Sequence, residues 1–136
     1  MMFAFVPSWA LCVKAEKANL RSGPGTKYDK TWEVYKYMPF HKIKRKGSWV
    51  KVRDVDNMDH WIYSKLITDR FLCAVVKKSK ANLRTGPGVT YKKSPQWPTA
   101  PRYASFRFLR NKGSWAQVQD SDGIKYWVSR SLIWVY

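Results

Sequence analysis

The sequence is poor in the residues that most catalytic and metal sites require. Its 136 residues include two cysteines, two histidines and 9 acidic residues. The histidines, His41 and His60, fall on predicted strands, where a single histidine is usually a packing or surface residue. Two cysteines supply too few ligands for a structural zinc site, and the Gly-x-x-x-x-Gly-Lys-(Ser/Thr) pattern of a phosphate loop is missing. We therefore expect no enzyme, no cofactor and no metal site.

Long apolar runs and a complete export signal are also missing. No run approaches the roughly 20 apolar residues that cross a bilayer. Residues 1–10 are apolar but lack the basic start of a signal peptide. They end in Ser8-Trp9-Ala10, the small-x-small pattern of a cleavage site. We interpret residues 1–10 as a remnant of an export signal, which predicts a periplasmic or secreted protein. The alternative is an N-terminal strand, packed or loose.

Negative charge is scarce as well. The 26 lysines and arginines outnumber the 9 acidic residues and give a net charge of +17. Residues 71–136 carry 12 basic and 2 acidic side chains, so the second half should dominate any contact with a polyanion. Nucleic acid, anionic lipid and wall polymers with carboxylates or phosphates all fit this charge. A solvated surface that keeps an aromatic-rich protein soluble fits it equally well.

An internal repeat organises the chain. Residues 18–25, ANLRSGPG, recur as ANLRTGPG at residues 81–88, and KGSW at 46–49 recurs at 112–115. The offset rises from 63 to 66 residues, so the second copy carries three extra residues. We place them within 94–101, where three prolines cluster. Blocks in the same order with one change of offset indicate a duplication.

Each copy has the pattern of short strands separated by turns. Apolar and polar residues alternate in residues 18–21, which predicts a strand with one buried face. Gly23-Pro24-Gly25 suits a type II turn, with a glycine at the position that needs positive φ. Asp56-Asn57 and Asp122-Gly123 are typical of hairpin turns. No segment predicts a long amphipathic helix, so the expected fold class is all-β.

These motifs resemble those of a known family. Asn-Leu-Arg-(Ser/Thr)-Gly-Pro-Gly, then Gly-Ser-Trp-x-x-Val, then Trp-(Ile/Val) and Leu-Ile look like the bacterial SH3-like (SH3b) domain. The nearest variant is common in exported proteins of Gram-negative bacteria. The resemblance covers residues 13–68 and 75–134, and it implies two tandem SH3-like small β-barrels, at 11–68 and 72–136. One departure is Tyr37-Met38-Pro39, which stands where the family usually has a glycine.

The resemblance also implies a disulfide. In an SH3-like barrel the first strand pairs with the last, so Cys12 and Cys73 would meet and close the first barrel. A loop of about 60 residues closed in this way would contribute roughly 4 kcal/mol of stability. An oxidising compartment favours this bond. The alternative is a pair of unbonded, half-buried thiols.

A candidate ligand site follows from strand geometry. Trp49 and Trp115 lie three residues before Val52 and Val118, so each tryptophan faces away from its valine. If the valines point inward, the tryptophans point to the groove that SH3 folds use for ligands. The alternative is that they pack at a barrel edge or between the domains. The candidate ligand-binding residues are Trp49, Trp115, Tyr28, Tyr91, Lys51 and Arg53.

Three functions from different classes remain open. The first is a non-catalytic cell-envelope module that binds peptidoglycan, its stem peptides or an envelope protein, as the resemblance implies. The second is a protein-interaction scaffold without wall contact. The third is binding of nucleic acid or another polyanion through the basic surface. A proline-rich ligand is not expected, because Tyr63 and Leu66 stand where that groove needs a proline and a tyrosine.

Overall fold

The computed structural model describes residues 6–136 as strands and turns with two short 3-10 helices. The expected all-β class is confirmed. This part of the chain contains no helix with the length and apolar character needed to span a bilayer. The first unit, residues 10–68, contains β1 (Ala10–Val13), β2 (Lys17–Arg21), β3 (Lys30–Tyr35), β4 (Pro39–Lys46), β5 (Trp49–Arg53), β6 (Asp59–Tyr63), the 3-10 helix η1 (Ser64–Leu66) and β7 (Ile67–Thr68).

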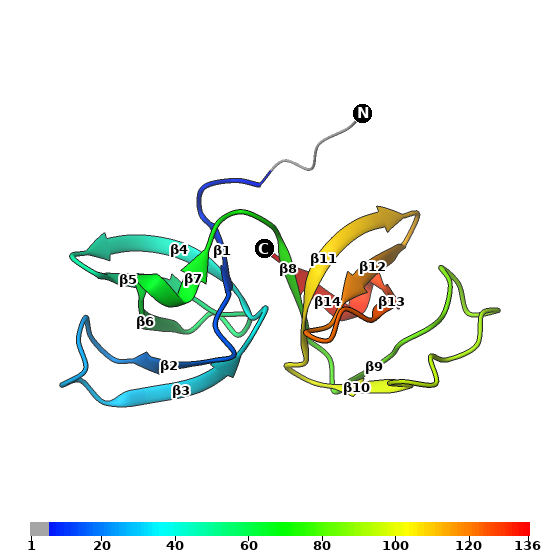
Figure 1. Ribbon diagram of the computed structural model, residues 1–136, viewed down its shortest axis with the longest axis horizontal. Coiled ribbons are helices and arrows are strands. Elements are labelled where there is room, and N and C mark those ends of the chain that lie inside the picture. Colours follow the sequence, from blue (N-terminus) through cyan, green and yellow to red (C-terminus); the bar gives the residue numbers. More distant parts are fainter. Residues whose placement is uncertain (1–5) are drawn as a thin grey trace.

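The second unit, residues 73–135, repeats this order of elements (Figure 1). It contains β8 (Cys73–Val76), β9 (Lys80–Asn82), β10 (Thr99–Pro101), β11 (Ser105–Lys112), β12 (Trp115–Gln119), β13 (Lys125–Ser129), the 3-10 helix η2 (Arg130–Leu132) and β14 (Ile133–Val135). The first unit forms one antiparallel sheet in the order β3-β2-β6-β5-β4-β1-β7. The second unit forms a sheet in the order β13-β12-β11-β8-β14 and a separate β10-β9 pair.

The prolines of the second unit explain why one of its strands is short. β3 has six residues, whereas its counterpart β10 has three. Pro95 and Pro98 lie just before β10 and have no amide hydrogen for a ladder. The backbone between β9 and β10 instead runs as a long loop, held where the amide of Ser94 donates to the carbonyl of Leu83 at 2.7 Å.

The Gly-Pro-Gly turns differ from the expected type II geometry. Gly25 is not among the residues with positive φ, and its amide donates to the carbonyl of Gly23 at 2.9 Å. A bond between residues two apart defines a tight three-residue turn, for which proline at the centre already has a suitable φ. Gly23 is required for a different reason, because a Cβ there would overlap the Tyr28 ring. The expected hairpin turns at Asn57 and Gly123 are confirmed, with φ of 68° and 85°.

Each unit has its own main core. Leu20 and Val52 are fully buried in the first, and Leu83 and Val118 in the second, as the alternating patterns predict. The two cores are in contact, because Val75 of the second unit belongs to the first cluster. The units therefore fold against each other and do not form two separate bodies.

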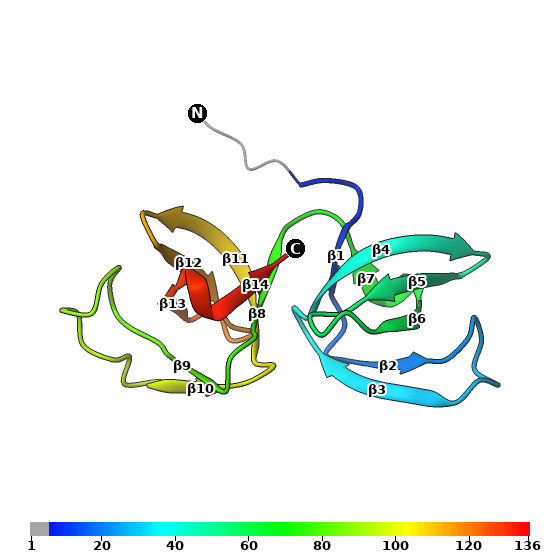
Figure 2. The same cartoon turned by 180° about the vertical axis from the view of Figure 1, so that it is seen from behind.

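The expected disulfide between Cys12 and Cys73 is present, but it joins the two units and does not close the first barrel. Cys12 lies in β1 and Cys73 in β8, so the bond connects the first strands of the two units. Their Cα atoms are 5.9 Å apart, and Figures 1 and 2 both show β1 and β8 side by side at the centre. The last strand of the first unit, β7, ends at Thr68, which pairs with Cys12. Cys73 comes after the chain has left that barrel and cannot close it.

Two tyrosines in the left-handed region complete the junction. Tyr37 and Tyr103 have φ of 75° and 72°, in the turns where the family usually has glycine. The Tyr37 ring meets Phe71 edge-on at 5.9 Å, and the Tyr103 ring meets Trp32 at 5.2 Å. The Tyr103 hydroxyl also donates to Asp56 at 2.5 Å. These contacts, to the linker residue Phe71 and across the two units, offset the strain of the backbone.

The expected export-signal remnant lies partly inside this fold. Residues 1–5 are outside the described residues. Ala10 begins β1, is fully buried and pairs with His41. The amide of Lys42 donates to the carbonyl of Trp9 at 2.7 Å. Cleavage after Ala10 would remove a buried strand residue, so the small-x-small pattern there belongs to the folded domain.

Candidate ligand-binding groove

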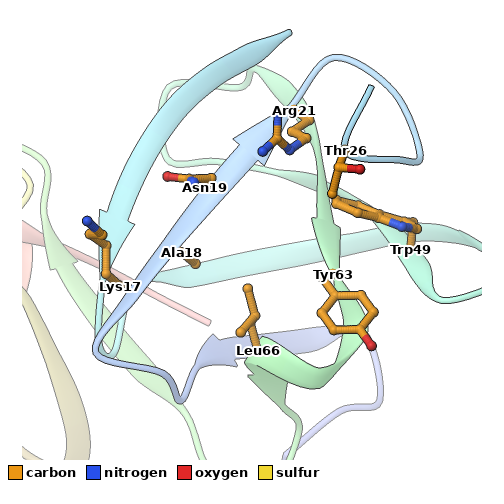
Figure 3. A pocket seen from close by; sticks show the side chains of 8 residues that line it. All are labelled: Lys17, Ala18, Asn19, Arg21, Thr26, Trp49, Tyr63 and Leu66. Atoms are coloured by element: carbon orange, nitrogen blue, oxygen red, sulfur yellow. The ribbon is translucent and has the colours of Figure 1, made fainter. Parts of the chain in front are cut away.

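A groove of about 390 Å³ opens on the outer face of the first unit (Figure 3). It lies between β2, the loop after β2, β5, the end of β6 and η1. The side chains that line it are Lys17, Ala18, Asn19, Arg21, Thr26, Trp49, Tyr63 and Leu66. Residues from the two ends of the unit thus meet at one site.

The apolar part of the groove is an aromatic pair with a leucine beside it. Trp49 and Tyr63 are register partners on β5 and β6, and their ring centroids are 5.8 Å apart. Leu66 follows on η1, which is tied to the β4–β5 turn where the Ser64 amide donates to the carbonyl of Ser48 at 2.8 Å. An open pair of rings next to an aliphatic side chain can hold an apolar ligand group.

The rim of the groove is positively charged. Lys17 lies 3.7 Å from Glu33, and Arg21 donates to the carbonyl of Tyr28 at 3.0 Å. The hydrogen bond from Lys30, together with the charges of Lys17 and Lys30, lowers the pKa of Glu33. Glu33 is the partner of both Lys17 and Lys30. Its single negative charge does not neutralise both lysines, so the rim keeps a net positive charge.

The side-chain oxygen of Asn19 on β2 has no hydrogen-bond partner among the described residues. Asn19 lines the groove, and its Oδ1 atom is buried without a hydrogen-bond partner in the described chain. Its counterpart in the second unit, Asn82, has a partner, because Thr99 donates to its Oδ1 at 3.2 Å. A buried polar group without a partner is costly. Because this oxygen has almost no exposed surface, a ligand in the groove does not reach it in this conformation.

Two of the predicted aromatic residues have a supporting place next to the site. Tyr28 is not among the residues that line the groove; its ring covers Gly23 and its carbonyl anchors Arg21. Tyr91 repeats both features, with its ring on Gly86 and its carbonyl 2.9 Å from Arg84. Each tyrosine thus holds the arginine of the Asn-Leu-Arg motif in place, Arg21 in the first unit and Arg84 in the second.

The predicted cations share the outward face of β5 with Trp49 but have a partner of their own. Lys51 lies 3.9 Å from Asp59, and Arg53 Nε lies 2.9 Å from it. The hydrogen bond from Arg53 lowers the pKa of Asp59. The structure thus places Lys51 and Arg53 in the β5–β6 hairpin outside the groove lining. Lys17 and Arg21 on β2 line the groove instead, and sequence reasoning missed them.

The second unit differs at the groove positions. Trp115 is half-buried at the place of Trp49. Tyr63 is replaced by Ser129, whose hydroxyl lies 3.1 Å from that of Ser131. Thr26 is replaced by Val89. The aromatic pair is therefore a property of the first unit.

A buried histidine and aspartate form a separate polar chain. His60 lies 2.7 Å from Asp54 and 2.7 Å from the Thr31 hydroxyl. Asp54 also accepts hydrogen bonds from the amides of Asp56 and Met58 at 2.9 Å. Burial opposes its ionisation, but the bonds from His60 and these amides outweigh burial and lower its pKa. The aspartate caps the β5–β6 turn.

The internal repeat indicates a structural role for this hydrogen-bond network of His60 and Asp54. In the second unit Asp120 accepts the same two amide bonds, from Asp122 and Ile124, and a bond of 2.7 Å from Tyr126. Tyrosine in place of histidine makes the same contact, and burial next to this carboxylate raises its pKa. The Thr31–His60–Asp54 arrangement occurs in the first unit alone. It is therefore a variant of the turn cap that Asp120 and Tyr126 form in the second unit.

The fold and the groove together define a small all-β domain with the features of a binding module. Residues 14–69 match the model of the bacterial SH3 domain family. This match confirms, for the first unit, the resemblance to SH3b domains inferred from the sequence.

The chain is also similar to a curated protein and to solved structures. It is 27% identical over 120 residues to YrvJ of Bacillus subtilis (strain 168), named as an N-acetylmuramoyl-L-alanine amidase. The match covers 81% of this chain and 21% of that protein, so the chain spans about a fifth of its relative. A crystal structure of an NlpC/P60 family protein from Bacillus cereus ATCC 10987 is 14% identical, with 93% and 56% coverage and a TM-score of 0.42. The endolysin LysPBC5 CBD is 12% identical, with 93% and 92% coverage and a TM-score of 0.37.

Proposed function

We propose that the chain is a non-catalytic binding module of the bacterial cell envelope, and that the first unit holds a short peptide in its groove. The peptide is a stem peptide of peptidoglycan or a segment of an envelope protein. The observation that carries the proposal is the Trp49–Tyr63 pair next to a positively charged rim.

The groove offers one partner for each chemical group of such a peptide. The aromatic pair and Leu66 accept an apolar side chain. Lys17 and Arg21 attract a carboxylate, which an arginine can bind through two parallel hydrogen bonds. This combination favours a short acidic peptide over a long uniform polyanion.

The family and the cysteines support an envelope location. The first unit matches the model of the bacterial SH3 domain family, and the similar YrvJ is named as an amidase of muramoyl-alanine bonds. The bond between Cys12 and Cys73 suits an oxidising compartment. We therefore propose a periplasmic or secreted protein.

The second unit has a supporting role in this proposal. We take residues 72–136 as a second SH3-like unit that stabilises the first through the disulfide and the tyrosine junction. Its groove position lacks the second ring, because Ser129 replaces Tyr63.

A pull-down with purified sacculi tests the proposal. We expect retention of the protein in about 0.5 M salt, where contacts between exposed charges are screened, and release by a soluble synthetic stem peptide. The variant Tyr63→Ser should lose retention, whereas Trp115→Ala in the second unit should keep it. No retention at low salt would exclude a wall ligand. Retention that a stem peptide does not reduce would place the ligand outside the groove.

A further inference from the structure

A second pocket in the first unit shares no lining residue with the groove. It has a volume of about 230 Å³ and lies where β1, β4, β7 and η1 meet. Its polar lining consists of Ser8, Lys42, Arg45, Ser64, Thr68 and Asp69. Two cations and three hydroxyl groups thus gather around one small cavity.

The two cations have free hydrogen-bonding capacity. Within residues 6–136, no salt bridge or side-chain hydrogen bond is formed by Lys42. Arg45 uses Nε to bond the carbonyl of Gly47 at 2.8 Å, which leaves both terminal nitrogens. Asp69 is the single acid in the lining. The pocket therefore carries a net charge of about +1 in a chain of +17.

The internal repeat shows that the barrel does not need these residues. With the offset of 66, the second unit has Phe108 in place of Lys42, Asn111 in place of Arg45, Arg130 in place of Ser64 and Trp134 in place of Thr68. None of these four positions keeps its chemistry. The combination of cations and hydroxyls is therefore an addition to the first unit that the fold itself does not explain.

We propose that this pocket binds a phosphate group, as a phosphomonoester or a phosphodiester. A guanidinium presents paired donors to phosphate oxygens, and an ammonium adds a point charge. Serine and threonine hydroxyls donate to the remaining oxygens. Asp69 repels the anion and limits the affinity, which suits a weak site that adds to binding elsewhere on the same polymer. This site is independent of the peptide groove.

The test is a titration of the labelled protein with inorganic phosphate, followed by amide NMR shifts. We expect the shifts to concentrate at Lys42, Arg45, Ser64 and Thr68. Arg45→Asn, which copies the residue of the second unit, should weaken binding by about tenfold or more. Asp69→Asn should strengthen it. Lys44→Ala is the matched control, because it removes the same charge from the same strand but outside the pocket.

Three outcomes would overturn the proposal. They are shifts spread evenly over the basic surface, equal losses in Arg45→Asn and Lys44→Ala, and no change in Asp69→Asn. Thermal unfolding of each variant shows that it is folded. Repeating the titration with poly(glycerol phosphate) and with phosphatidylglycerol vesicles distinguishes a wall polymer from a lipid as the source of the phosphate. Tyr63→Ser should bind phosphate normally, which separates this site from the groove.

Discussion

Trp49 and Tyr63 lie opposite each other on β5 and β6, and the second unit keeps the tryptophan but has Ser129 in place of the tyrosine. The serine shows that the ladder tolerates a small polar residue at this place. The tyrosine is therefore available for ligand binding.

The first prediction uses this difference. Tyr63→Ser should reduce affinity for a soluble stem peptide by about tenfold or more, because removal of a ring at the centre of a site costs roughly 2 kcal/mol. Tyr63 is only half-buried, so the free energy of unfolding should change by about 1 kcal/mol or less. Calorimetric titration and urea unfolding measure the two quantities. A large loss of stability with unchanged affinity would indicate packing.

The second prediction concerns the two asparagines. Asn19→Ala should leave both stability and peptide binding almost unchanged, because Asn19 Oδ1 has no partner to lose and is covered from the groove. Asn82→Ala should destabilise the chain by about 1 kcal/mol, because it removes the bond from Thr99. Urea unfolding of both variants, with peptide titration, compares them directly. Equal stability losses would show that Asn19 is bonded in solution.

The third prediction concerns the disulfide. Free-thiol titration of the denatured, unreduced protein should find no reactive thiol. Cys12→Ser with Cys73→Ser should destabilise the chain by about 4 kcal/mol under the loop-entropy relation, for a separation of 61 residues. Because the bond joins two units, its loss should also separate their unfolding transitions. Two thiols per chain in oxidised preparations would contradict the bond.

The fourth prediction is a dependence of stability on pH. The pKa of Asp54 is lowered in the folded chain, so its contribution is present above the ordinary carboxyl pKa of about 4. It is lost as the pH falls through the lowered value. Stability should therefore decrease on acidification below about pH 4. Asp54→Asn should be less stable at neutral pH and respond less to acid, as measured by thermal unfolding between pH 2 and 7. An unchanged acid response would assign the effect to other carboxyls such as Asp59.

Local patterns in the sequence identified the fold well. Alternation predicted that Leu20, Val52, Leu83 and Val118 would point inward, and all four are fully buried. The repeat also located the extra residues at the prolines that shorten β10. These features depend on neighbours in the chain, and side-chain period and turn chemistry describe them directly.

Features that depend on distant segments could not be read in the same way. Lys17 and Arg21 line the groove because β2 pairs with β6, a contact between residues far apart in the sequence. The disulfide was expected to close the first barrel, because the sequence does not show that β1 and β8 lie side by side. The Gly-Pro-Gly turn was misassigned because Gly23 is explained by the Tyr28 ring, and Gly25 does not have the positive φ of a type II turn.

The junction between β1 and β8 also has a consequence for recognition over longer distances. A covalent bond and the packing of Tyr103 against the first unit remove the rotation that a flexible tether would allow between tandem modules. A polymer that touches both halves therefore meets contact points at one constant separation. Such a protein selects its target by the distance between the groups that it binds. A polymer that carries the same groups at another distance would gain no avidity from the second half.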